Sequence, residues 1–122
     1  MQTGLNLKNA LQLPTCKGME LIEVEAIIRI EAISNYSKLY FTGGRTLVVA
    51  KVLRWFEEKL AVHGFIRVHK KHLLNKSYIR DYVRGTLQQS QGGKVELSNG
   101  EWISVSKRKN TYFLQYWLNS AA

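Results

Sequence analysis

The first half of the chain alternates apolar and polar positions in short runs that are typical of β-strands. In residues 26–33 alternate positions form an apolar and a charged series, Ile28, Ile30 and Ala32 against Arg29 and Glu31. Residues 36–42 are rich in aromatic and β-branched side chains, and the Gly43-Gly44 pair predicts a hairpin turn into residues 45–49. This half is therefore predicted to be an antiparallel sheet.

Residues 51–63 change to helical spacing, with one apolar face made by Val52, Leu53, Phe56 and Leu60. Gly64 follows at the position where a helix end favours a positive φ. Neither Ala50 nor Lys51 offers a side-chain acceptor for an N-terminal cap, so packing must hold this helix. We expect Trp55 and Phe56 to lie in or near the core.

The last third predicts further strands and a second helix. The apolar residues Val95, Leu97, Ile103 and Val105 share one face only if an odd-length loop joins their strands. We therefore predict a three-residue loop, 98–100, with Gly100 in the left-handed region. Ser106 is a good N-cap for a helix that runs to Leu118. The predicted fold class is mainly β with two helices.

The start of the chain is weakly patterned. Leu7, Ala10 and Leu11 are compatible with a short helical turn, but Pro14 and Gly18 interrupt it. We interpret residues 1–18 as an N-terminal extension or linker and residues 19–122 as one domain, which suits the total length of 122 residues.

A net charge of +9 indicates a polyanionic partner, either nucleic acid or an anionic membrane surface, although charge that only keeps the protein soluble is an alternative. The charge is segregated along the chain. Residues 19–33 carry four glutamates and one arginine, whereas residues 65–84 carry six cations and one aspartate. The cations lack the spacing of a basic amphipathic helix, so we expect no membrane partner.

Other classes of protein find little support. Cys16 is the only cysteine, which excludes an internal disulfide framework, and the longest aliphatic run, 47–50, is far too short to span a bilayer. With no signal peptide visible, we expect a cytoplasmic protein. His69 and His72 have no third ligand nearby, so no metal site is predicted. No nucleophile–base pair or glycine-rich phosphate loop is present, so we expect neither an enzyme nor a cofactor.

Two basic segments are candidate contacts for a polyanion. Apolar residues flank His69, Lys70, Lys71 and His72 on both sides, so this short segment must project from the fold. The last helix is predicted to begin at Ser106 with Lys107, Arg108 and Lys109, although the helix dipole favours anions there. Such a local conflict is expected where function overrides stability, and these groups would suit phosphate. A solvated charge run is the alternative.

Three separated segments resemble the LytTR-type DNA-binding domains of bacterial response regulators. They are Ile30-Glu31-Ala32 with Asn35-Tyr36, then residues 65–75, and finally Gly100 with residues 103–108. With the helix between them, the match covers residues 20–118 in the right order. The resemblance implies an elongated antiparallel β arrangement that contacts DNA through loops inserted into successive major grooves.

Carried over by position, the resemblance implies three sets of DNA contacts: Asn35, Ser37 and Lys38; His69, Lys70 and Lys71; and Ser106, Lys107, Arg108 and Lys109. The lysines at 70, 71, 107 and 109 and Arg108 would anchor phosphates. Ser37, Lys38, His69 and Ser106 would suit base edges. The chain departs from the family pattern at Lys71, where serine is usual, and at His72, where an aromatic residue is usual.

The implied function is sequence-specific binding of double-stranded DNA at repeated half-sites by two copies of a bacterial transcription regulator. Such domains usually follow a receiver domain in two-component systems. This chain contains one aspartate, Asp81, too few for a receiver. It is therefore expected to be either a stand-alone regulator or a DNA-binding domain of a longer protein, and a receiver domain or sensor kinase outside the chain is a candidate partner.

Two alternatives stay open. The first is a protein interaction module in which Trp102 and Trp117 bind another protein and the charge serves solubility. The second is recognition of single-stranded RNA, which requires Tyr36, Tyr40 and Tyr78 to be exposed stacking platforms. We expect Tyr40 and Tyr78 to be largely buried instead.

Overall fold

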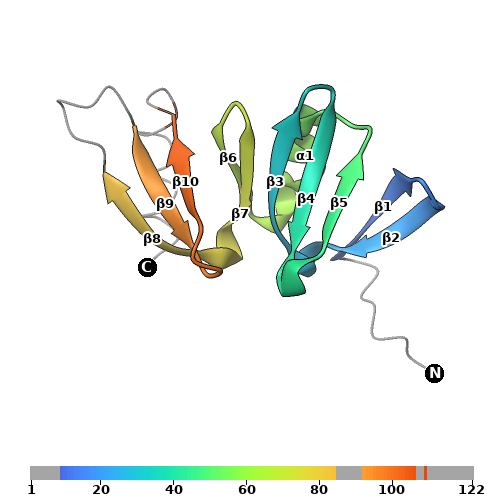
Figure 1. The fold of residues 1–122 in the computed structure, drawn as a ribbon, viewed down its shortest axis with the longest axis horizontal. Helices are drawn as coiled ribbons and strands as arrows, with labels where there is room; N and C mark the ends of the chain where they lie inside the picture. Colours follow the sequence, from blue (N-terminus) through green and yellow to red (C-terminus); the bar gives the residue numbers. More distant parts are fainter. Residues whose placement is uncertain (1–8, 85–91, 107–108, 110–122) are drawn as a thin grey trace.

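A computed structural model describes residues 9–84, 92–106 and 109 (Figure 1). Three antiparallel sheets follow one another along the long axis of the molecule. A hairpin of β1 (Ala10–Thr15) and β2 (Gly18–Glu23) lies at one end. The central sheet has the order β5-β4-β3-β7-β6, and a sheet of order β10-β9-β8 lies at the other end.

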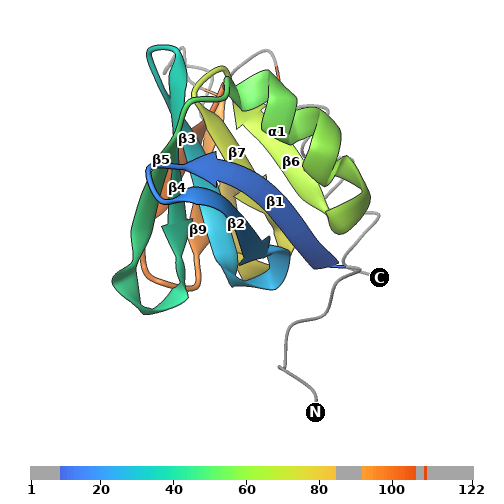
Figure 2. The same cartoon turned by 90° about the vertical axis from the view of Figure 1, so that its right-hand side faces the viewer.

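The central sheet consists of β3 (Ile27–Ile33), β4 (Tyr36–Phe41), β5 (Thr46–Val49), β6 (Phe65–His69) and β7 (His72–Asn75). The third sheet consists of β8 (Ile79–Arg84), β9 (Gly93–Leu97) and β10 (Trp102–Val105). Helix α1 (Leu53–Leu60) connects β5 to β6 across one face of the central sheet (Figure 2). Four 3₁₀ turns, Val24–Ala26, Thr42–Gly44, Ala61–His63 and Lys76–Tyr78, complete the described elements.

The first hydrophobic core lies between α1, the β1–β2 hairpin and the central sheet. Alternation builds it: Ile30 of β3 pairs with Leu39 of β4, and both side chains are fully buried. Helix α1 contributes Leu53, Phe56 and Leu60. Phe56 is buried, and the ring of the half-buried Trp55 meets it edge-on at 5.0 Å between centroids, so both residues lie where we expected.

The ends of α1 also agree with the sequence prediction. Val52 precedes the helix without a side-chain cap. At the other end the chain tightens into the 3₁₀ turn Ala61–His63, and Gly64 takes a φ of +83° and donates its N–H to the Ala61 carbonyl. Packing therefore holds the start of this helix, and a left-handed glycine ends it.

A second core joins the third sheet to β6, β7 and the start of β3. In the part of the chain that the structure describes, its buried residues are Ile28, Ile66, Val68, Leu74, Ile79, Val95, Leu97, Ile103 and Val105. Ile103 pairs with Val95, and the Leu97 N–H donates to the Glu101 carbonyl at 2.8 Å. The loop therefore has the predicted three residues, 98–100, and Gly100 has a φ of +91°.

Two expectations were wrong for the described residues. Ala10 and Leu11 belong to strand β1, not to a helical turn, because Leu11 and Leu13 alternate with period two and Leu13 is fully buried in the first core. Pro14 is tolerated because β1 is an edge strand. The described residues contain one α-helix rather than two. The predicted second helix, 106–118, lies outside them except for Ser106 and Lys109.

Candidate nucleic-acid interface

The three segments that were predicted to contact DNA reach the same edge of the sheets, the upper one in Figure 1. They are the β3–β4 turn at Ser34 and Asn35, the β6–β7 turn at Lys70 and Lys71, and the end of β10 at Ser106. Backbone hydrogen bonds tie them together: Ala32 N–H donates to the Lys71 carbonyl at 2.9 Å, and Ser106 N–H donates to the Val68 carbonyl at 2.8 Å. We call this surface the basic edge, defined by Ser34, Asn35, His69, Lys70, Lys71, Ser106 and Lys109.

The first turn projects from the sheet under backbone strain. Ile33 pairs with Tyr36, which leaves Ser34 and Asn35 as a two-residue turn with both residues exposed. Ser34 has a φ of +55° and is the one non-glycine residue with positive φ in the described part of the chain. Such a conformation costs roughly 1–2 kcal/mol for an ordinary residue, and strained residues concentrate at functional sites.

Ser37 and Lys38 lie on opposite faces of β4. Ser37 is fully buried, and its hydroxyl donates to the Lys51 carbonyl at 2.7 Å. Its side chain therefore serves the fold and is not presented at the basic edge, contrary to our expectation. Lys38 lies on the face away from α1, where it pairs with Glu31 across the strands and holds its ammonium 5.1 Å from the centroid of the Tyr40 ring.

Arg67 organises the second turn. Its guanidinium donates to the Lys70 carbonyl at 2.5 Å, to the His69 carbonyl at 3.0 Å and to the Glu57 carboxylate at 2.9 Å. Glu57 lies on α1, so this arginine fixes the turn to the helix. Arg67 was not among the predicted site residues. Its position on the same strand as His69, two residues earlier, indicated that it lies near the turn. Its contact with Glu57 on α1 could not be predicted from the sequence.

The charge on His69 is controlled by its surroundings. Burial, with additional repulsion from Lys70, Lys71 and Arg67, lowers the pKa of this imidazole. Its Nδ1 accepts the Lys71 N–H at 3.2 Å, which places the proton of the neutral ring on Nε2. The neutral ring therefore retains one N–H donor for a phosphate or base acceptor.

His72 lies beside this turn, with its ring centroid 5.4 Å from that of His69. Burial is the first cause that lowers its pKa as well. Across the residues that the structure describes, no three histidine, cysteine or acidic side chains come together as metal ligands would.

The third segment meets the second one across a groove. Ser106 Oγ accepts the Lys109 N–H at 3.1 Å, the bond expected of a helix N-cap. A groove of about 500 Å³ lies between the two segments. It is lined by Glu57, Arg67, His69, Lys70, Ser106 and Lys109. Lys107 and Arg108, which we also predicted as contacts, lie outside the described residues.

The aromatic residues of the two alternatives differ in their exposure. Tyr40 and Tyr78 are half-buried rather than largely buried, and their hydroxyls donate to the Glu31 carboxylate and the Glu25 carbonyl. Tyr36 is exposed. Trp102 is 48% exposed on β10, whereas Trp117 lies outside the described residues. None of the described helices is long and apolar enough to cross a membrane.

A cationic edge formed by turns between β-strands is the electrostatic pattern of a nucleic-acid-binding domain. The family model of the LytTr DNA-binding domain matches residues 17–117. The chain therefore belongs to this family and is a DNA-binding domain of the kind found in regulators. A comparison with curated proteins gave no match.

A solved structure from Bacillus cereus supports the fold. It is a LytTr DNA-binding domain of a response regulator, and it is similar to this chain with a TM-score of 0.73 and 23% sequence identity. The alignment covers 88% of this chain and 94% of the other. The elongated antiparallel β arrangement that the sequence resemblance implied is thereby confirmed as the fold.

Proposed function

We propose that this domain binds double-stranded DNA sequence-specifically, by inserting the turns of the basic edge into successive major grooves. The observation that carries the proposal is the convergence of three segments, at residues 34–35, at residues 70–71 and at Ser106 with Lys109, on one edge of the sheets. A major groove about 12 Å wide admits a two-stranded β-ribbon, and both hairpin turns have this form. Strand pairing next to each turn restricts its motion, as direct contact with base edges requires.

The side chains of the basic edge divide into two roles. Lys70, Lys71 and Lys109, with Lys107 and Arg108, anchor phosphates, because ammonium and guanidinium groups neutralise the backbone irrespective of sequence. Asn35, His69 and Ser106 suit base edges, since each offers directional donors or acceptors. Lys38 approaches the duplex from the open face of β4. Ser37 is not part of the proposed interface, because its buried hydroxyl is already bonded to the Lys51 carbonyl.

We further propose that two copies bind repeated half-sites on one face of the duplex in a bacterial cytoplasm. The input then comes from a receiver domain or a sensor kinase of a two-component system. The support is the match to the LytTr DNA-binding domain family, together with a sequence whose single aspartate is too few for a receiver domain.

The test is a selection of random duplex DNA with the purified domain and a charge-matched pair of variants. The first variant changes Lys70, Lys71 and Lys109 to alanine. The control changes three cations away from the basic edge, Lys17, Arg45 and Lys59, and so removes the same net charge.

The proposal predicts that the wild type and the control enrich a repeated motif and that the edge variant does not. Binding without an enriched motif would indicate a nonspecific basic surface. No binding at low salt would contradict the proposal and favour a protein partner for the exposed Trp102.

A further inference from the structure

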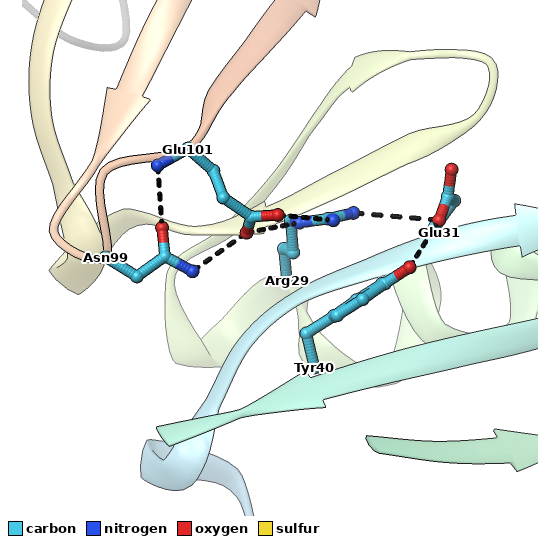
Figure 3. Close-up of polar contacts among 5 residues, drawn as sticks. All are labelled: Arg29, Glu31, Tyr40, Asn99 and Glu101. Atoms are coloured by element: carbon cyan, nitrogen blue, oxygen red, sulfur yellow. Dashed lines mark hydrogen bonds and ion pairs between the residues drawn. The ribbon is translucent and has the colours of Figure 1, made fainter. Parts of the chain in front are cut away.

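A half-buried ion pair joins the central sheet to the third sheet (Figure 3). Arg29 of β3 is 6% exposed, whereas the Glu101 side chain is 38% exposed. The Arg29 guanidinium donates to both carboxylate oxygens of Glu101, at 3.0 and 2.9 Å. Glu101 lies directly before β10, 72 residues away in sequence. A bidentate arginine–carboxylate pair is directional, since it fixes both a distance and an angle between the elements that carry it.

Neighbouring groups hold each partner in place. The Arg29 guanidinium lies over the Tyr40 ring, 3.7 Å from its centroid, and the Tyr40 hydroxyl donates to Glu31 at 2.7 Å. Glu31 in turn lies 3.8 Å from the Arg29 guanidinium. On the other side, the Asn99 amide donates to the Glu101 carboxylate at 2.8 Å and accepts the Glu101 N–H at 3.0 Å. Figure 3 shows these five residues as one connected set.

As far as the chain is described, the central sheet contributes to both hydrophobic cores, whereas the third sheet contributes to the second. The first core contains Leu39 of β4, and the second contains Val105, the residue directly before Ser106. Apolar contacts are non-directional, so the second core alone leaves the angle between the sheets weakly determined. One directional attachment, from Ser106 N–H to the Val68 carbonyl, lies at the basic edge. The Arg29–Glu101 pair supplies another at the opposite edge (Figures 1 and 3).

We propose that the Arg29–Glu101 pair sets the spacing between the first and third DNA-contacting segments and thereby controls DNA affinity without touching DNA. Arg29 and Glu101 are then positioning residues. This inference rests on the proposed function, because spacing matters only if both segments bind one duplex. If the pair served stability alone, a replacement of both partners by apolar side chains that keeps the fold would leave DNA affinity unchanged.

The decisive variant is the double exchange Arg29→Met with Glu101→Leu. It leaves the net charge unchanged and fills the space with apolar groups. We expect a folded protein with a melting temperature near that of the wild type. If the binding-competent orientation falls to about a tenth of the population, the dissociation constant for the selected duplex rises about tenfold. The same exchange at the exposed pair Arg54 and Glu58 is the control and should leave binding unchanged.

The orientation itself is measured by pulsed electron paramagnetic resonance. Spin labels are attached at Lys59→Cys on α1 and Ser104→Cys on β10, both exposed, in a Cys16→Ser background. The distance distribution should be narrow with Arg29 and Glu101 present and broad in the double exchange. If the double exchange does not fold, Arg29→Lys serves instead, because it keeps the charge but lacks the bidentate fork.

The outcomes separate the two proposals. Wild-type binding with weaker binding and a broader distribution in the variant supports the positioning role. Equal affinity, or an unchanged distance distribution, overturns that role and leaves the proposed function intact. If the wild type binds no duplex, the proposed function fails and so does the role of the pair in DNA binding.

Discussion

The two edges of the sheets, upper and lower in Figure 1, use their polar groups in opposite ways. At the lower edge polar side chains bond within the protein: Asn75 donates to the Ile27 carbonyl, Arg80 donates to the Ser98 carbonyl, and Arg29 pairs with Glu101. At the basic edge, as far as the chain is described, the ammonium groups of Lys70, Lys71 and Lys109 have no ion pair.

This difference assigns stability of the fold to the lower edge and binding to the basic edge. Buried polar groups that are bonded internally stabilise the fold, whereas neighbouring cations without partners repel each other. The polar groups of the lower edge therefore stabilise the fold. The cations at the basic edge are instead explained by a polyanion that binds there and neutralises them. The same substitution made at each edge should then have different consequences.

The largest effect on stability is expected from Asn75→Ala at the lower edge. Asn75 is buried, and its side chain donates to the Ile27 carbonyl at 2.9 Å and accepts the Ser77 N–H at 3.0 Å. Removing it leaves two backbone groups unpaired, at a cost of about 2–4 kcal/mol in the free energy of unfolding. Denaturant titration measures this loss. A change below about 0.5 kcal/mol would contradict the contrast between the edges, since that is typical of a surface site.

Asn35→Ala is the matched change at the basic edge. The Asn35 side chain is exposed, so unfolding should shift by less than about 0.5 kcal/mol. Binding to the selected duplex should weaken by about 1–3 kcal/mol if the amide reads a base edge. Fluorescence anisotropy on matched and mismatched duplexes checks both affinity and specificity. An equal loss on every sequence would assign Asn35 to the DNA backbone instead.

Ser34→Gly should stabilise the protein, because glycine adopts the observed φ of +55° without steric strain. The gain is limited to about 1 kcal/mol, since glycine also gives the unfolded chain more freedom. Ser34→Ala is the control and should give no such gain. Thermal unfolding of the two variants decides the matter, and a lower melting temperature for the glycine variant would exclude strain at this turn.

A smaller effect concerns pH. The folded-state pKa of His69 is lowered, so its contribution to stability is fully present above the unfolded value near 6.5 and is lost as pH falls through the folded value. DNA should favour the protonated ring of His69, so the affinity for DNA should rise as pH falls over the same interval. His69→Gln should flatten that rise, whereas His63→Gln should not. A pH profile of affinity unchanged by His69→Gln would remove this histidine from the interface.

Local patterns predicted much of this molecule. Period-two alternation gave the strands, the parity of Val95 and Ile103 gave the three-residue loop, and Gly64 gave the end of α1. The same alternation also predicts the burial of one candidate contact residue. Ser37 shares its parity with Leu39 and Phe41, which are core residues, so its burial was predictable.

Long-range pairs were not predictable in this way. Arg67 with Glu57 and Arg29 with Glu101 depend on how separate elements pack, and one sequence gives no spacing rule for such contacts. The strand β1 was missed for a related reason. Its alternation is short and becomes meaningful only because Leu13 packs into the first core.

The most direct test of the basic edge is the salt dependence of affinity for the selected duplex. With about five cations on phosphates, the logarithm of the association constant should fall against the logarithm of salt concentration with a slope of about −4 to −5. Changing Lys70, Lys71 and Lys109 to alanine should reduce the slope to about −2, while the matched changes at Lys17, Arg45 and Lys59 should preserve it. A wild-type slope near zero, or equal slopes for the two variants, would contradict the account.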